Sequence, residues 1–265
     1  IKKIIYSVKD PDPRVSGKGE FFLKSNGIEV IHGLMEKEAL DINEGFFKKI
    51  KTGLPFVTLK FGTSEDGKIA TKGGVSKWIT SKKSRVYGHE MRSEHDAILI
   101  GLGTVLNDNP RLTCRIKGKE GKSPVRIILD TNLRIPKDCH LINTACEVPT
   151  WVITENKMID CLEDFGVKII NVKNIKNIHS VLKVLANAGL TKILVEGGSK
   201  VLGSFFHQGF GDKIAWFKAP VTIGPEGIPA IEGFELKDIY NSQIYKSNFK
   251  KNIDKDVLEV FLTKG

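Results

Sequence analysis

The chain has 265 residues, of which 40% are hydrophobic and 27% charged, with 41 Lys and Arg against 31 Asp and Glu. This composition excludes a disordered or low-complexity protein, and no run of about 18 apolar residues predicts a transmembrane helix. The net charge of +10 favours an anionic partner, either nucleic acid or a phosphorylated small molecule, although most lysines are scattered singly as on an ordinary surface.

The first 51 residues predict a small βα-like piece. Residues 4–8 and 28–33 are short apolar runs typical of strands, and residues 35–51 carry apolar side chains at roughly helical spacing. The helix is expected to stop at Thr52-Gly53. The piece looks too small to fold alone, so we expect a domain boundary between residues 52 and 53. Because the chain begins with Ile, we expect a fragment of a longer product.

The rest of the chain alternates strands with helices. Apolar, β-branched runs predict strands at 54–62, 97–103, 125–130, 150–154, 167–172 and 192–198, with helices at 81–95, 179–190 and 199–210. Residues 213–224 and 257–264 read as closing strands, expected to be antiparallel. Continuous apolar strands suit a sheet that helices cover on both faces. The sequence therefore predicts an α/β, three-layer domain over 53–265 with a mostly parallel sheet and an antiparallel C-terminal strand.

The segment 194–206 carries the clearest chemical signal. A strand ends at Glu196, two glycines follow, and Ser199 opens a helix. Such a turn lets backbone N–H groups approach a phosphate at the positive end of the helix, although an ordinary turn remains the alternative. It is not the dinucleotide fingerprint, because no Gly-x-Gly-x-x-Gly opens a helix.

Lys60 and Glu196 are the candidate reactive groups. Lys60 lies inside an apolar strand, where a lysine is costly to bury unless it is paired or contacts an anion. Glu196 stands at a strand end, where residues of open α/β sheets face a ligand crevice. The alternative for Glu196 is a cap on the next helix or a solvent-facing carboxylate.

Five segments occur in an order that resembles a known family. They are LPFVTLKFGTSEDGKIAT, GGVSKWITS, MRSEHDAILIGLGTVLNDNPRLTCR, VRIILDTNLRIP and LVEGGSKVLGSF. Together they resemble the reductase half of the bifunctional riboflavin-biosynthesis deaminase/reductase, over about 53–265. The resemblance implies a dihydrofolate-reductase-like fold and NADPH-dependent reduction of 5-amino-6-(5-phosphoribosylamino)uracil to its ribitylamino product. The alternatives are a pterin-type reductase of the same fold and a basic nucleic-acid-binding protein.

The resemblance also implies site residues by position. Lys60 and Glu196 would be catalytic, and substrate contacts fall on Ser76, Arg92, Leu112, Arg115 and Glu196. Cofactor contacts fall on Gly62, Trp78, Thr104, Asp108, Thr131, Gly198, Ser199, Lys200, Val201, Leu202, Gly203 and Ser204. Arg92 and Arg115 are expected to bind the 5-phosphate, because guanidinium groups bind phosphate bidentately. Glu65 departs from the family, which usually has an apolar residue before Asp66-Gly67.

Residues 1–52 are similar to the last part of the family's deaminase domain. The zinc deaminase signature, H-x-E with a later P-C-x-x-C, has no match in the chain, and its four cysteines lack metal-ligand spacing. We therefore expect no zinc and no deaminase activity in this chain unless a deaminase part lies upstream. We further expect a cytoplasmic homo-oligomer with no nucleic-acid or membrane partner.

Overall fold

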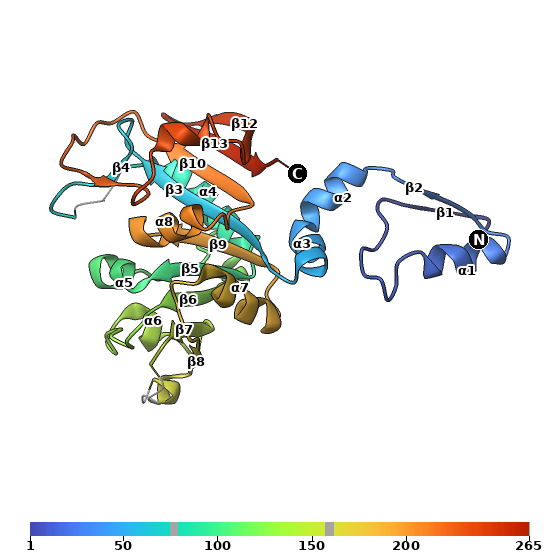
Figure 1. The fold of residues 1–265 in the computed structure, drawn as a ribbon, viewed down its shortest axis with the longest axis horizontal. Helices are drawn as coiled ribbons and strands as arrows, with labels where there is room; N and C mark the ends of the chain where they lie inside the picture. Colours follow the sequence, from blue (N-terminus) through green and yellow to red (C-terminus); the bar gives the residue numbers. More distant parts are fainter. Residues whose placement is uncertain (75–78, 157–161, 265) are drawn as a thin grey trace.

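The computed structural model describes residues 1–74, 79–156 and 162–264 (Figure 1). Within these residues the centre is a nine-stranded sheet in the order β12-β13-β10-β3-β9-β5-β6-β7-β8. The strands are β3 (Phe56–Thr63), β5 (Ala97–Gly101), β6 (Val125–Leu129), β7 (Thr150–Thr154), β8 (Val167–Asn171), β9 (Lys192–Gly197), β10 (Lys213–Lys218), β12 (Tyr245–Ile253) and β13 (Asp256–Thr263).

The sheet is mostly parallel, as predicted. The strands from β10 to β8 pair in parallel, and β13 pairs antiparallel with β10 and with β12. The antiparallel C-terminal strand is thus confirmed. The expectation for 213–224 was partly wrong, because the strand ends at Lys218 and runs parallel to β3. The edge strand β12 was missed, since its seven central residues are exposed and carry no apolar alternation.

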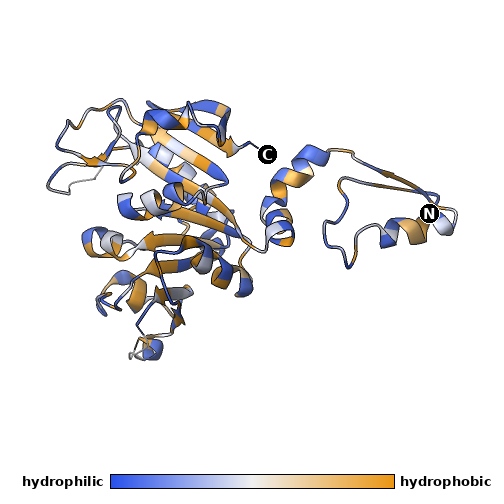
Figure 2. Ribbon diagram, in the orientation of Figure 1, coloured by the Kyte–Doolittle hydropathy of each residue, from blue (hydrophilic) through white to orange (hydrophobic). Residues whose placement is uncertain are grey.

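Helices cover both faces of the sheet and complete the predicted three layers. One face packs against α4 (Lys82–Ser93), α5 (Leu102–Asp108) and α6 (His140–Asn143), and the other against α7 (Ile178–Asn187) and α8 (Ser199–His207). Figure 2 shows the central strands as mainly hydrophobic. Short 3₁₀ helices lie at Glu120–Lys122, Glu163–Phe165 and Leu236–Ile239. No helix in the described ranges is long and apolar enough to cross a membrane.

Two short strands form a separate antiparallel pair beyond the end of β3. They are β4 (Lys68–Ala70) and β11 (Ile228–Pro229). They bring together a turn that follows β3 and a loop that follows β10. This two-stranded flap becomes one wall of the site described below.

The N-terminal piece has its own two-stranded parallel sheet. It contains β1 (Lys3–Tyr6), α1 (Lys18–Ser25) and β2 (Glu29–His32), which extend away from the large sheet (Figure 1). The single helix predicted over 35–51 is two helices, α2 (Glu36–Ile42) and α3 (Glu44–Thr52). They meet at Asn43, whose φ of −100° departs from helical geometry.

Helix α3 is attached to the large sheet by ion pairs. Glu44 lies 2.9 Å from the Lys192 ammonium and 2.8 Å from that of Lys213, and the Lys48 ammonium lies 2.6 Å from Asp212. Residues 44–52 therefore pack with strands β9 and β10 in space, although they precede the expected boundary in the sequence.

Glu44→Ala is expected to lower the free energy of unfolding by about 1–3 kcal/mol, because two half-buried ammonium groups lose their carboxylate. Urea unfolding of the variant and the parent measures the difference. Glu38→Ala, which removes an exposed carboxylate from α2, is the matched control and should change stability by less than about 0.5 kcal/mol. Equal losses in the two variants would contradict the role of Glu44.

Candidate active site

Lys60 and Glu196 lie at corresponding positions on neighbouring parallel strands. The β3–β9 pairing runs up to Leu59 opposite Val195, so each candidate residue is the next one along its strand. On the other side of β9, Val195 pairs with Leu99 and Gly197 with Ile100, so the register shifts by one residue at Glu196. Such irregularities redirect side chains near active sites. The backbone thus places Lys60, inside β3, at the level at which β9 ends with Glu196 and Gly197.

Three charged side chains converge there. The Nε of Arg92 donates to Glu196 Oε1 at 2.7 Å and a terminal nitrogen donates to Oε2 at 2.9 Å, while Lys60 Nζ lies 3.6 Å from Oε2. The structure therefore brings together Lys60 and Glu196, the two residues predicted to be catalytic. It also pairs Arg92, predicted to bind phosphate, with the carboxylate in bidentate geometry.

Glu196 is held as a carboxylate. Burial of the side chain would raise its pKa, but the opposing charges of Arg92 and Lys60 and the hydrogen bonds from Arg92 outweigh burial and lower the pKa to about 2. Glu196 therefore has no proton to donate near neutral pH.

The Lys60 side chain runs past Gly88 of α4, and its ammonium group lies 5.7 Å from the centre of the Phe217 ring.

A second contact from α4 orients the loop that follows α5. The carbonyl of Thr113 accepts hydrogen bonds from a terminal nitrogen of Arg92 and from His89 Nδ1, both at 3.1 Å. Beside Thr113, Leu112 has a φ of 56° and a buried side chain. The sequence analysis missed His89, although its spacing of three residues from Arg92 places both on one helix face.

Arg115 extends the positive charge of this region. Burial and the nearby positive charges of Arg92 and Arg111 lower the pKa of Arg115. In the same way, burial and the charges of Arg92 and Arg115 lower the pKa of His89. In the described part of the chain Arg115 forms no ion pair, so this loop offers a cation to an anionic group.

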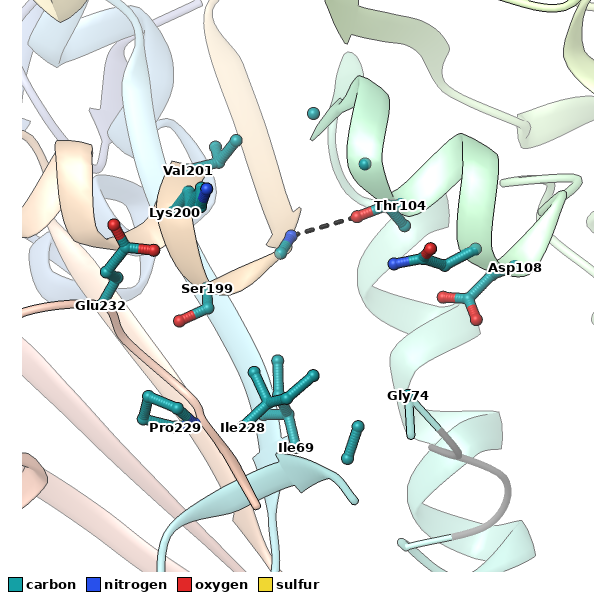
Figure 3. A pocket seen from close by; sticks show the side chains of 15 residues that line it. Ile69, Gly74, Thr104, Asp108, Ser199, Lys200, Val201, Ile228, Pro229 and Glu232 are labelled. Carbon is teal, nitrogen blue, oxygen red and sulfur yellow. Dashed lines mark hydrogen bonds between the residues drawn. The ribbon is translucent and has the colours of Figure 1, made fainter. Parts of the chain in front are cut away.

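A cavity of about 420 Å³ lies between α5 and α8, and its lining includes Gly198, two residues after Glu196 (Figure 3). The β4–β11 flap closes one side of it. Its lining residues are Ile69, Ala70, Gly74, Gly101, Gly103, Thr104, Asn107, Asp108, Gly198, Ser199, Lys200, Val201, Ile228, Pro229 and Glu232. The volume is in the range of small-molecule and cofactor sites.

The start of α8 fits a phosphate-bearing nucleotide. Ser199 Oγ is buried and has no hydrogen-bond partner among the described residues, at the first position of this nine-residue helix. The N–H of Gly198 donates to Thr104 Oγ at 3.2 Å, which ties α8 to α5 across the cavity (Figure 3). An orphaned hydroxyl at the positive end of a helix is the donor set that a phosphate oxygen satisfies.

The predicted cofactor contacts divide into two groups. Those that line the cavity are Thr104, Asp108, Gly198, Ser199, Lys200 and Val201, and those that do not are Gly62, Thr131, Leu202, Gly203 and Ser204. Leu202 packs in the core, and Gly203 lies against the carbonyl of Glu232. Ser76 and Trp78 lie outside the described residues. Sequence reasoning missed the flap residues, because two strands of three and two residues give no periodic signal.

Comparison with known proteins agrees with this geometry. The family model for the RibD C-terminal domain matches residues 55–251. The riboflavin biosynthesis protein RibD of Aquifex aeolicus is 41% identical over 98% of this chain and 72% of its own length, and that of Bacillus amyloliquefaciens is 40% identical over 92% and 67%.

Solved structures give the same result. The crystal structure of a diaminohydroxyphosphoribosylaminopyrimidine deaminase/5-amino-6-(5-phosphoribosylamino)uracil reductase from Thermotoga maritima is 34% identical, with a TM-score of 0.86 over 100% of this chain and 72% of that one. Acinetobacter baumannii RibD is 29% identical, with a TM-score of 0.88 over 100% and 73%. The chain therefore belongs to the RibD C-terminal domain family and is an oxidoreductase of riboflavin biosynthesis.

Proposed function

We propose that this chain catalyses the NADPH-dependent reduction of 5-amino-6-(5-phosphoribosylamino)uracil to the ribitylamino product. The observation that carries the proposal is the arrangement at the end of β9. Glu196, with its two cations, is separated by one residue from Gly198, which begins the N-terminal segment of α8 that lines the 420 Å³ cavity. A substrate group bound at Glu196 and a nucleotide bound in the cavity would therefore lie against the same short segment of backbone.

The cavity residues would hold the cofactor. The buried Ser199 hydroxyl and the N-terminus of α8 suit its phosphates, and the apolar flap residues Ile69 and Ile228 suit a ring. When bound, the dihydronicotinamide supplies the hydride for the sugar C1 carbon. The walls of the cavity would shield the reaction from water and align the reacting carbons.

The charged cluster of Lys60, Arg92 and Glu196 would bind the sugar of the substrate. Opening of the ribose ring leaves an oxygen that needs a proton. Of the three groups in the cluster, Glu196 is ionised and the raised pKa of Arg92 keeps its proton in place, so Lys60 is the proposed donor to that oxygen. Glu196 would orient Lys60 and the sugar hydroxyls, and Arg115 would bind the 5-phosphate.

NADPH is expected to raise the melting temperature of the purified chain, because a ligand that binds only the folded state stabilises it. Thermal melts with and without NADPH give the first readout, and NADPH oxidation in the presence of the phosphoribosylaminouracil gives the second. A dihydropterin in place of that substrate tests the pterin-reductase alternative. No melting shift at millimolar NADPH would count against the proposed cofactor.

Other sequence predictions stay open. We propose that residues 1–52 are the end of a deaminase domain, on the basis of their resemblance to it. The absence of zinc, the cytoplasmic location, the homo-oligomeric state and the lack of nucleic-acid partners remain predictions. Family membership does not favour the pterin-type reductase or the nucleic-acid-binding protein.

A further inference from the structure

The flap wall of the cavity is attached to the sheet through a short turn. Residues 64–67 connect β3 to β4, whose Ile69 and Ala70 line the cavity opposite Thr104 and Asp108. Asp66 stands in this turn. It does not line the cavity and is not among the predicted cofactor contacts.

The carboxylate of Asp66 holds the loop that leads to β11. Oδ1 accepts the N–H of Ile223 at 3.1 Å, and Oδ2 accepts the N–H of Gly224 at 2.7 Å. Two backbone bonds flank this contact, from Glu65 N–H to the Val221 carbonyl at 2.8 Å and from Ala230 N–H to the Gly67 carbonyl at 3.2 Å. The strands β4 and β11 pair at only two register positions, so the hydrogen bonds of Glu65, Asp66 and Gly67 to residues 221–230 make up much of the contact between the two halves of the flap.

The Asp66 side chain is ionised near neutral pH. The nearby Ser64 hydroxyl and the amides of Ile223 and Gly224 outweigh the effect of burial and lower its pKa to about 2. Hydrogen bonds to an ionised acceptor are shorter and stronger than neutral ones. A single carboxylate that binds two successive amides fixes both the position and the orientation of the loop.

We propose that Asp66 is a positioning residue for the nucleotide cavity: by holding the amides of Ile223 and Gly224 it sets the β4–β11 wall at the distance from α5 and α8 that the nicotinamide nucleotide requires. This inference rests on the proposed function, because it concerns the proposed cofactor. Asp66 acts through the backbone of the flap and touches neither cofactor nor substrate. Its loss should therefore weaken cofactor binding more than the chemical step.

The test compares Asp66→Ala and Asp66→Asn with Glu65→Ala. Glu65 is the matched control, since its side chain is an exposed carboxylate in the same turn and only its backbone N–H bonds the loop. NADPH affinity is measured by fluorescence titration of the nucleotide. The kcat is measured at saturating NADPH from the rate of NADPH oxidation, and amide hydrogen exchange is measured on the protein without ligand.

Asp66→Ala is expected to raise the Kd for NADPH at least about tenfold, with kcat within about twofold of the parent. Exchange at Ile223, Gly224 and Ala230 should accelerate at least about tenfold, while the amides of α7 keep their protection. Asp66→Asn retains one carbonyl acceptor and should fall between, and Glu65→Ala should match the parent in all three measurements.

Several outcomes would overturn the inference. One is parental affinity in Asp66→Ala, and another is a lowered kcat with unchanged Kd. If the α7 amides of Asp66→Ala also exchange faster, the substitution has disturbed the whole fold, and Asp66→Asn becomes the deciding variant. An Asp66→Asn protein with the parental Kd for NADPH and the parental exchange rates at Ile223, Gly224 and Ala230 would then reject the proposal. A parent chain that binds no NADPH refutes the proposed function and this inference together, which distinguishes that failure from the others.

Discussion

Glu196→Gln is expected to lower the substrate-dependent rate at least about tenfold, equivalent to roughly 1.4 kcal/mol of transition-state stabilisation. The amide keeps the shape of the side chain but removes the charge that holds Lys60 at 3.6 Å and Arg92 in bidentate contact. NADPH affinity should change far less, because the cavity is lined by other residues. Steady-state rates and direct NADPH titration give the two readouts. Normal turnover would remove Glu196 from the site.

The same substitution carries a pH signature. The folded-state pKa of Glu196 is lowered to about 2 from its ordinary value of 4.5, so its charge contributes stability that is fully present above about pH 4.5 and lost as the pH falls toward 2. Removing the charge leaves the largely buried Arg92 guanidinium without its carboxylate partner, at a cost of about 3 kcal/mol at neutral pH. The stability difference between parent and Glu196→Gln should therefore shrink as the pH falls from 4.5 toward 2. A difference that does not depend on pH would contradict the charge pairing.

Lys60→Ala is expected to lower the rate at least about tenfold as well, but to leave stability almost unchanged. Glu196 keeps both hydrogen bonds from Arg92 when the ammonium is removed, so no buried charge loses its last partner. The free energy of unfolding should therefore change by less than about 1 kcal/mol. Melts, rates and NADPH titrations of this variant separate a chemical role from a structural one.

The control for Lys60→Ala is Lys82→Ala, which removes an exposed lysine at the start of α4. It should behave as the parent in all measurements. Normal turnover in Lys60→Ala would exclude Lys60 as the proton donor. If Lys60→Ala instead loses NADPH affinity while keeping the parental melting temperature, Lys60 would be assigned to cofactor binding.

Sequence reasoning reached the layers and the central pair because both depend on local signals. Continuous β-branched runs between amphipathic segments specify buried parallel strands, whatever their order in the sheet. A lysine within one such run and a glutamate at the end of another stand out because charge inside an apolar strand needs a partner. Lys60 is paired with Glu196 because β3 and β9 are neighbours in the sheet. No local sequence pattern encodes this strand order.

The features that were missed depend on contacts between distant segments. The bidentate pairing of Arg92 with Glu196 joins α4 to β9 across 104 positions, and the flap joins β4 to a strand about 160 residues later. The break at Asn43 was hidden because apolar spacing continues through it, while the contacts of Glu44 with Lys192 and Lys213 give α3 its own direction.

The place of β9 in the strand order bears on how the molecule fluctuates. β9 is the middle strand of the nine, with β3 and β5 on its two sides, whereas β12 and β8 are edges and the β1–β2 sheet is separate. Local unfolding begins where few contacts must break, so these outer units should open at low free energy and the centre only near the global free energy of unfolding. A molecule whose N-terminal piece or sheet edge is transiently open should thus keep Glu196 and the turn after it in place. The strands that carry Lys60 and Glu196 should therefore be among the last segments to unfold when the protein is heated or cut by a protease.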